Sequence, residues 1–305
     1  MASVVLCEDS PTHSALMQSI LAADGHSVRS AADGREGLKQ IEREMPDMVV
    51  TDLRMPEMNG LELVRTIVDS YPNLPAIVVT ARGSEDLAVD ALALGAVNFV
   101  PKASLGVLLN PAVRRTLRFS QSDQSYQAST GKLLLPEFYY KLRNSLDSIN
   151  PASRFVIEAL SAAGKMTPNV RLRIGMAVAS ALFNSICYGN LELRDEDPRI
   201  ANAIHRKGTS REDLVELAES QPYRKRFVHL KVSVGQNDTR ISVAHDGPGR
   251  IARFHPAPGT AESFELEQCR GMMLITSFMD EMMFNNDYSE VVMVKQHHAM
   301  VESAC

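Results

Sequence analysis

Five polar side chains in the first third of the sequence could do chemistry together, because each follows a short apolar run. They are Glu8 and Asp9 after residues 4–6, Asp52 after 48–50, Thr80 after 76–79 and Lys102 after 97–100. If these runs are parallel strands, the side chains meet at the carboxyl edge of the sheet, where open α/β sheets bind ligands. Three carboxylates repel one another there unless a hard divalent cation such as Mg²⁺ binds among them. With a lysine opposite, the implied chemistry is phosphoryl transfer to an aspartate, in which metal and lysine neutralise the developing charge.

The elements that must position these side chains alternate along residues 1–118. Apolar runs at 4–6, 27–28, 48–50, 76–79 and 97–100 are each followed by a stretch whose apolar residues recur at helical spacing. The last of these stretches covers 105–117. Strands that alternate with helices predict an α/β domain with a parallel five-stranded sheet covered by helices on both faces.

The segment around Asp52 resembles a known motif. Residues 49–60 read Val-Val-Thr-Asp-Leu-Arg-Met-Pro-Glu-Met-Asn-Gly and are similar to the phosphoacceptor loop of two-component response regulators. Residues 1–118 as a whole resemble the receiver domain of that family, which has a flavodoxin-like, doubly wound fold. Ala103 is a departure, because the family usually has a proline after the lysine. It puts the local peptide geometry in doubt, but not the chemistry.

The resemblance implies a role for each polar position. Asp52 would be the phosphorylated aspartate and Lys102 the lysine on the phosphate side. Thr80 would be the switch hydroxyl and Phe99 the switch aromatic residue. Mg²⁺ would be bound by Glu8, Asp9, Asp52 and the backbone carbonyl of Arg54. The alternative is a doubly wound domain whose acidic edge is inert.

Length and composition limit the remaining possibilities. The chain has 305 residues, which suggests two domains at roughly 150 residues each. A net charge of −5 lacks the basic excess of nucleic-acid-binding domains, so no nucleic-acid partner is expected. The four cysteines have no metal or redox spacing. The N-terminus lacks the pattern of a signal peptide, and no apolar stretch approaches the length of a membrane span, so we expect a cytoplasmic protein without membrane contact.

The second half of the chain reads as a separate domain. Residues 119–136 are expected to be a linker because residues 119–131 are polar and rich in Ser and Gln; alternatively, the last receiver helix extends into them. For 137–305 we expect helices and an antiparallel sheet in an α+β sandwich. The expected elements are a strand within 132–147, helices from Pro151 and over 167–188, a helical hairpin at 195–220, strands at 228–234 and 241–243, a helix at 270–280 and a strand at 290–295.

Three short runs in this half resemble the N-box and the two glycine boxes of the GHKL ATPase fold. They are Ala-Leu-Phe-Asn at 181–184 with Tyr-Gly-Asn at 188–190, His-Asp-Gly-Pro-Gly at 245–249 and Arg-Gly-Met-Met-Leu-Ile at 270–275. Within that fold the anti-sigma-factor serine kinases are most similar. The resemblance implies a nucleotide site that keeps Asn184, the family's Mg²⁺ ligand, together with Gly247, Gly249 and Gly271.

Three departures from the family pattern affect three different functions. Ser180 occupies the position of the general-base glutamate, and a neutral hydroxyl cannot act as a base near neutral pH. His245 replaces the aspartate that accepts from the adenine amino group, and it could contact adenine only weakly. Cys269 replaces the first glycine of the second box, so its side chain partly blocks a backbone approach to phosphate. We therefore expect a degenerate domain that binds ATP weakly or not at all.

These observations predict a response regulator that is not an enzyme beyond its own phosphoryl transfer. A cognate histidine kinase or phosphotransfer protein would phosphorylate Asp52, and the second domain would then act by binding a protein. By the family resemblance, that partner would be an anti-sigma or sigma-type regulator, and a homodimer is left open. An alternative is a receiver-gated, ATP-dependent serine kinase. A third alternative is a phosphate sink for the upstream kinase, with a passive second domain.

Overall fold

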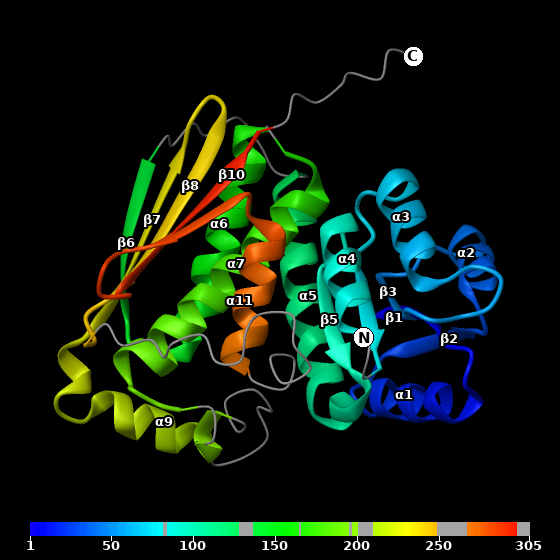
Figure 1. Ribbon diagram of the computed structural model, residues 1–305, viewed down its shortest axis with the longest axis horizontal. Helices are drawn as coiled ribbons and strands as arrows, with labels where there is room; N and C mark the ends of the chain where they lie inside the picture. The colour runs from blue at the N-terminus through cyan, green and yellow to red at the C-terminus, as the bar shows by residue number, and fades with distance from the viewer. Residues whose placement is uncertain are drawn as a thin grey trace. The chain divides into compact units, whose positions relative to one another are not determined.

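The computed structural model describes residues 1–81, 84–127, 137–164, 166–194, 197–200, 210–248 and 267–297. The chain divides into two compact units, the first formed by Met1–Ser120 and the second by the described residues from Gln121 onward. Each unit has its own five-stranded sheet (Figure 1).

The first unit is built on a parallel sheet with the strand order β2-β1-β3-β4-β5. Its strands are β1 (Ser3–Cys7), β2 (Ser27–Ala31), β3 (Met48–Asp52), β4 (Ala76–Thr80) and β5 (Asn98–Pro101). Its helices are α1 (Pro11–Ala23), α2 (Gly34–Arg43), α3 (Gly60–Ser70), α4 (Glu85–Leu94) and α5 (Leu105–Gln127). The predicted flavodoxin-like, doubly wound fold is therefore confirmed for this unit.

Local sequence explains where the helices near the acidic edge begin. Ser10 caps α1 by accepting from the backbone N–H of His13, and Pro11 occupies the first turn, where its missing N–H has no consequence. Asn59 and Glu62 form a reciprocal capping box at the start of α3. Because both caps follow directly on loops that carry carboxylates, they fix the points at which those loops end.

The last helix of the first unit is longer than expected. Helix α5 was predicted to end at residue 117, but it continues to Gln127, so the first part of the predicted linker is helical. No glycine or proline occurs between 112 and 127, so no residue there interrupts the helix. The structure shows the alternative, in which α5 extends into this segment, and residues 128–136 lie outside the described part of the chain.

The second unit contains an antiparallel sheet with the strand order β6-β7-β8-β10-β9. The strands are β6 (Glu137–Arg143), β7 (Phe227–Val234), β8 (Asp238–His245), β9 (Glu281–Phe284) and β10 (Glu290–Gln296). Helices α6 (Ile149–Ala163), α7 (Pro168–Asn184) and α11 (Glu267–Phe278) lie side by side along the sheet (Figure 1). Many α+β domains combine an antiparallel sheet with helices, so this arrangement by itself does not identify the family.

Helix α7 is the central helix of the second unit. It begins at Pro168 after Thr167, whose side chain accepts from the backbone N–H of Val170, and it ends at Asn184, four residues earlier than expected. A π-helical turn, η3 (Ser185–Asn190), continues it. Among the described residues, only the stretch Pro168–Asn190 is long and apolar enough to cross a membrane, but 89% of its most apolar window is buried within the protein. A core helix has this pattern.

Two other segments of the second unit differ from the prediction or test it only in part. Strand β9 was not predicted at all. Of the helical hairpin expected at 195–220, the structure describes α9 (Ser210–Glu219) and a short helical stretch at 198–200. The segment between them lies outside the described residues.

Candidate functional site

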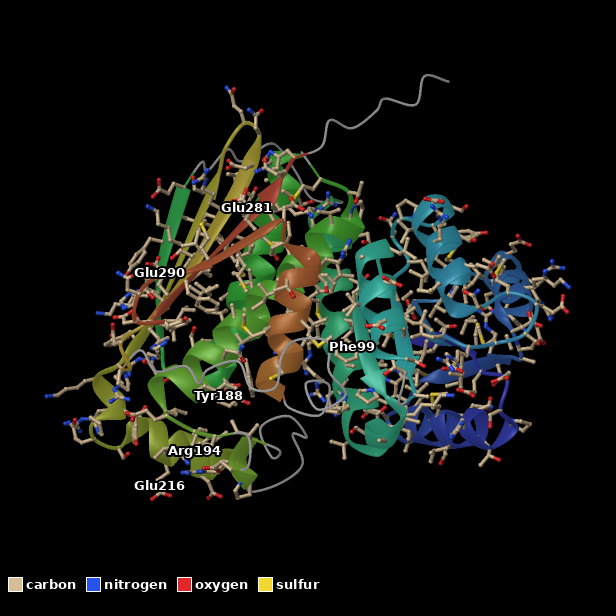
Figure 2. The ribbon with its side chains drawn as sticks, in the orientation of Figure 1. Phe99, Tyr188, Arg194, Glu216, Glu281 and Glu290 are labelled. Atoms are coloured by element: carbon tan, nitrogen blue, oxygen red, sulfur yellow. The ribbon has the colours of Figure 1, made fainter. Side chains whose placement is uncertain are left out.

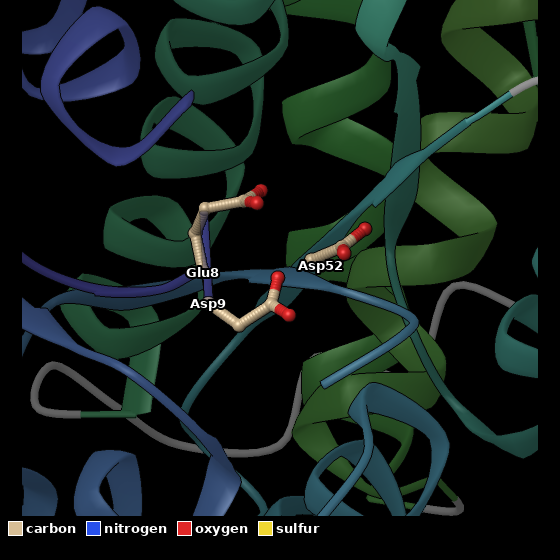
Figure 3. A group of neighbouring side chains, drawn as sticks. All are labelled: Glu8, Asp9 and Asp52. Carbon is tan, nitrogen blue, oxygen red and sulfur yellow. The ribbon is translucent and has the colours of Figure 1, made fainter. Parts of the chain in front are cut away.

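The predicted acidic cluster forms at the carboxyl edge of the first sheet. Strands β1 and β3 are parallel neighbours, with Cys7 opposite Thr51, so Glu8 and Asp9 emerge beside Asp52 (Figure 3). One carboxylate oxygen from each of the three acids lies within 4.8 Å of the others. Glu8 and Asp52 are buried, whereas Asp9 is exposed. Three oxygen ligands, one of them open to solvent, suit a hydrated Mg²⁺ ion.

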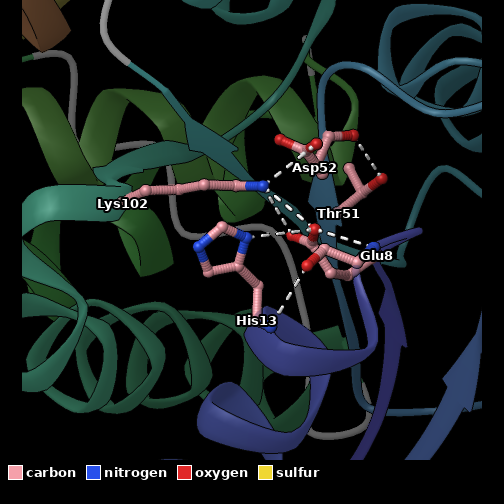
Figure 4. A network of polar contacts seen from close by, with 6 residues as sticks. Glu8, His13, Thr51, Asp52 and Lys102 are labelled. Atoms are coloured by element: carbon pink, nitrogen blue, oxygen red, sulfur yellow. Dashed lines mark hydrogen bonds and ion pairs between the residues drawn. The ribbon is translucent and has the colours of Figure 1, made fainter.

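Lys102 neutralises part of this charge. Its Nζ lies 2.8 Å from Oε2 of Glu8 and 3.2 Å from Oδ2 of Asp52 (Figure 4). Burial lowers the pKa of Lys102, but the hydrogen bond to Glu8 and the charges of both acids outweigh that effect, so the pKa is raised. The ammonium group therefore stays charged at neutral pH, beside the carboxylate that would receive an anionic group.

Glu8 has two further polar neighbours, the cap residue before α1 and a side chain in the first turn of α1. The backbone N–H of Ser10 donates to its Oε1 at 3.2 Å, and Nδ1 of His13 lies 3.7 Å from the same oxygen (Figure 4). His13 lies on the first turn of α1, four residues after Asp9. This spacing after the acidic pair was the only signal in the sequence that could have pointed to it.

The remaining receiver positions lie along the same edge of the sheet. Thr80 ends β4 and is buried next to β3, where Val79 lies opposite Asp52. Phe99 is buried in the neighbouring strand β5 and is labelled in Figure 2. Arg54 follows β3 in the loop before α3, and its side chain is exposed. Thr80 thus ends its strand, Arg54 follows β3, and Phe99 lies two residues before the end of β5.

The loop between β3 and α3 is fixed by close backbone contacts. The N–H of Gly60 donates to the carbonyl of Leu53 at 3.1 Å, and the N–H of Gly34 donates to the carbonyl of Met58 at 3.0 Å. A side chain at position 60 would place its Cβ 2.1 Å from the carbonyl oxygen of Asp52. Only glycine fits this position, which explains why the helix can begin so close to the acidic cluster.

The three GHKL-like runs also come together in the second unit. A Cβ added to Gly271 on α11 would lie 3.4 Å from Oδ1 of Asn184 and 3.5 Å from Cβ of Ser180, both on α7. At the end of η3, Gly189 lies so close to the His245 ring that a Cβ there would be 2.6 Å from Cδ2. Gly249 lies outside the described residues.

A second close contact joins η3 to the run after β8. A Cβ on Gly247 would be 2.0 Å from the carbonyl oxygen of Gly189, so the backbone of η3 touches the backbone after β8. The predicted positions that the structure describes therefore cluster around the end of α7.

The polar groups of this second cluster are buried without partners. Oγ of Ser180, both amide atoms of Asn184 and both ring nitrogens of His245 have no hydrogen-bond partner among the described residues. Burial, the largest effect, lowers the pKa of His245, and Arg226 also lowers it, whereas the backbone near Tyr288 and the charges of Asp287 and Asp246 oppose them. The imidazole is therefore neutral at pH 7. A neutral ring offers one donor and one acceptor rather than the carboxylate of the family pattern.

Comparison with known proteins shows what the first unit is similar to. The profile described as "Response regulator receiver domain" matches residues 4–112. Luminescence regulatory protein LuxO of Vibrio campbellii is 27% identical over 208 residues, which cover 61% of this chain and 46% of LuxO. Transcriptional regulatory protein AfsQ1 of Streptomyces coelicolor is 33% identical over 135 residues, covering 44% of this chain and 60% of AfsQ1. The chain thus spans less than two thirds of the length of these relatives.

Solved receiver domains are also similar. One is a CheY-like receiver domain protein from Methanospirillum hungatei, at 25% identity and a TM-score of 0.39; the match covers 40% of this chain and 98% of that one. Another is a receiver domain protein from Clostridium thermocellum, at 27% identity and a TM-score of 0.34, with 38% and 96% covered.

Proposed function

Residues 4–112 are a response regulator receiver domain, and we propose that this domain accepts a phosphoryl group on Asp52. Glu8, Asp9, Asp52 and the backbone carbonyl of Arg54 would hold Mg²⁺. The observation that carries the proposal is the convergence of three carboxylate oxygens within 4.8 Å, with Nζ of Lys102 3.2 Å from Asp52. A receiver domain of a two-component system implies a histidine kinase or phosphotransfer protein as the phosphoryl donor.

Each side chain has a definite task in this reaction. A carboxylate oxygen of Asp52 attacks the phosphorus of a phosphohistidine, an acyl phosphate bond forms, and the P–N bond breaks as the imidazole leaves. Bound Mg²⁺ supplies positive charge that offsets the phosphoryl oxygens. The ammonium of Lys102 neutralises the same oxygens from the other side. The Thr80 hydroxyl would donate to one of them, and Phe99 in the adjacent strand would reorient with it.

The test is phosphorylation of the full chain by acetyl phosphate, followed by intact-mass spectrometry. The wild-type protein should gain one phosphoryl group in Mg²⁺ and none in a chelator. Asp52→Asn should gain none, whereas the control Asp69→Asn, at an exposed position of α3, should behave like the wild type. A phosphorylated Asp52→Asn protein would refute the assignment.

For the second unit we propose a degenerate GHKL domain, related to the anti-sigma-factor serine kinases, that acts by binding a protein. Support comes from the clustering of Asn184, Gly271 and His245 around the end of α7. Ser180 supplies no base, so turnover is not expected. An anti-sigma or sigma-type regulator is the proposed partner. AfsQ1 is named a transcriptional regulatory protein, so the expected absence of a nucleic-acid partner stays a prediction.

A receiver-gated serine kinase is the second candidate, and one observation favours it. The unpartnered buried atoms of Ser180, Asn184 and His245 would be paired by a bound nucleotide. Calorimetry of Mg-ATP binding to the full chain separates the candidates. Binding tighter than roughly 100 μM, or about −5.5 kcal/mol, that is lost in Asn184→Ala would favour the kinase. No detectable binding would favour the protein-binding domain.

A further inference from the structure

A pocket of about 90 Å³ opens in the second unit, next to η3 and the start of β7. It is lined by the turn after β6, by η3 and the residue after it, by α9 and by the start of β7. Ile186, Leu191 and Leu214 are buried and form its apolar part. Figure 2 shows α9, with Glu216 labelled on it. The volume is smaller than that of an engineered apolar cavity of about 150 Å³ that binds benzene, so the pocket fits one branched apolar side chain rather than a whole metabolite.

An unsatisfied amide lines this pocket. Asn144 follows the last residue of β6 and is only 6% exposed. Neither its Oδ1 nor its Nδ2 has a hydrogen-bond partner within the described parts of the chain. A buried carboxamide without partners is costly unless something else satisfies it. Its donor and acceptor together are complementary to the C=O and N–H of a peptide group.

The charged side chains around the pocket bear on the charge that a ligand should carry. Arg226 is already used, since its Nη1 bonds the carbonyl of Asn190 and lies 2.7 Å from Oε1 of Glu192. Arg143, next to Asn144 in the chain, is exposed and forms no ion pair with any described residue. Glu219 comes from α9 on another side of the pocket. Asp147 and Arg224 also line the pocket. A ligand that fills the pocket and reaches Asn144 can place a carboxylate beside Arg143, which is next to Asn144 in the chain.

We propose that this pocket binds a peptide segment of a partner protein through one branched apolar side chain. The amide of Asn144 pairs with the peptide group of that residue, and Arg143 pairs with a neighbouring carboxylate of the segment. The inference rests on the proposed protein-binding role of the second unit and gives that role a location and a recognition chemistry.

The probe is a phage-displayed library of random peptides, panned on the full chain. Ala218→Leu on α9, which fills the pocket from its wall, serves for counter-selection. Selected peptides should carry a leucine, isoleucine or valine next to an aspartate or glutamate. Fluorescence anisotropy should show affinity at least about tenfold weaker for Ala218→Leu and Arg143→Glu. Arg240→Glu is the matched control, because Arg240 is an exposed arginine near the opposite end of the sheet and should leave affinity unchanged.

Asn144→Leu separates recognition from a structural role. Replacing an unpaired buried amide by an apolar group of similar size should raise the urea midpoint of unfolding and weaken peptide binding. A lower midpoint with unchanged affinity would overturn the proposal. It would also be overturned if no selected peptide distinguished the wild type from Ala218→Leu, or if Arg143→Glu bound as tightly as Arg240→Glu.

The same preparations are treated with acetyl phosphate to keep the two proposals apart. Normal phosphorylation of Asp52 without peptide binding overturns the docking pocket and leaves the receiver assignment intact. Peptide binding without phosphorylation of Asp52 supports the docking pocket and overturns the receiver assignment.

Discussion

Replacing Lys102 by methionine should show how strongly the acidic cluster depends on the charge of this one lysine. Methionine keeps most of the apolar stem and removes the charge. The side chain of Lys102 is 15% exposed, and its Nζ faces buried oxygens of Glu8 and Asp52. Without the ammonium group, the buried carboxylates of Glu8 and Asp52 lose the ion-pair partner that they share.

The size of the effect follows from the distances. At an effective dielectric constant of about 20, attractions over 2.8 Å and 3.2 Å are worth roughly 6 and 5 kcal/mol before desolvation is subtracted. Removing one partner of a buried ion pair costs roughly 3–5 kcal/mol in practice. We expect Lys102→Met to lose about that much stability in a chelator. In Mg²⁺ at 100 times its dissociation constant, Mg²⁺ binding should raise the free energy of unfolding of the variant by about 2.7 kcal/mol.

The assay is urea unfolding of the full chain followed by far-UV circular dichroism, in chelator and in Mg²⁺. The transition that moves with Mg²⁺ reports on the first unit. Lys39→Met, which removes an exposed lysine of α2, is the control and should change little. Because the folded-state pKa of Lys102 is raised, its contribution is complete below the ordinary lysine pKa of about 10.4 and is lost as pH rises through the folded value.

Two results would refute this reasoning. A Lys102→Met protein that Mg²⁺ does not stabilise relative to the chelator would mean that unbalanced carboxylate charge is not the cause of the loss. A loss as small as that of Lys39→Met would mean that the carboxylates do not need Lys102 at all.

Three further predictions concern other positions. Gly60→Ala should cost roughly 3 kcal/mol in urea unfolding and slow phosphorylation by acetyl phosphate, since its Cβ meets the carbonyl of Asp52; unchanged kinetics would contradict this. Asn59→Ala should cost about 1 kcal/mol in the same unfolding assay through loss of the cap. The stability that His245 confers should be present above about pH 6.5 and be lost as pH falls through its lowered folded pKa; unfolding of His245→Gln should depend less on pH between 7 and 5.

The receiver unit could be predicted closely because local signals and tertiary structure agree in it. Apolar runs such as 76–79 are buried on both faces, and caps such as Asn59 begin helices at the residues that chemistry favours. The cluster of Glu8, Asp9 and Asp52 followed from strand order alone, since parallel neighbours end at one edge. His13 could not be found this way, because its approach to Glu8 depends on the rotation of α1.

The errors have physical causes too. Composition suggested a linker after residue 118, but polar residues without Gly or Pro can continue a helix, as α5 does to Gln127. Strand β9 covers Glu281–Phe284, which contains two methionines and lacks β-branched residues, so its pairing with β10 decides its structure. In the second unit, motif spacing predicted which residues meet, but not whether their polar groups would find partners.

The two edges of the second sheet have a consequence for self-association. Strand β6 is open on one side among the described residues and carries Glu137, Lys141 and Arg143, whereas the other edge, β9, is four residues long. Charged side chains and short length both discourage strand pairing between molecules. A homodimer formed by continuing the sheet is therefore disfavoured. Replacing these three charges by threonine would leave an uninterrupted strand edge, and fibre formation during expression would be the expected failure.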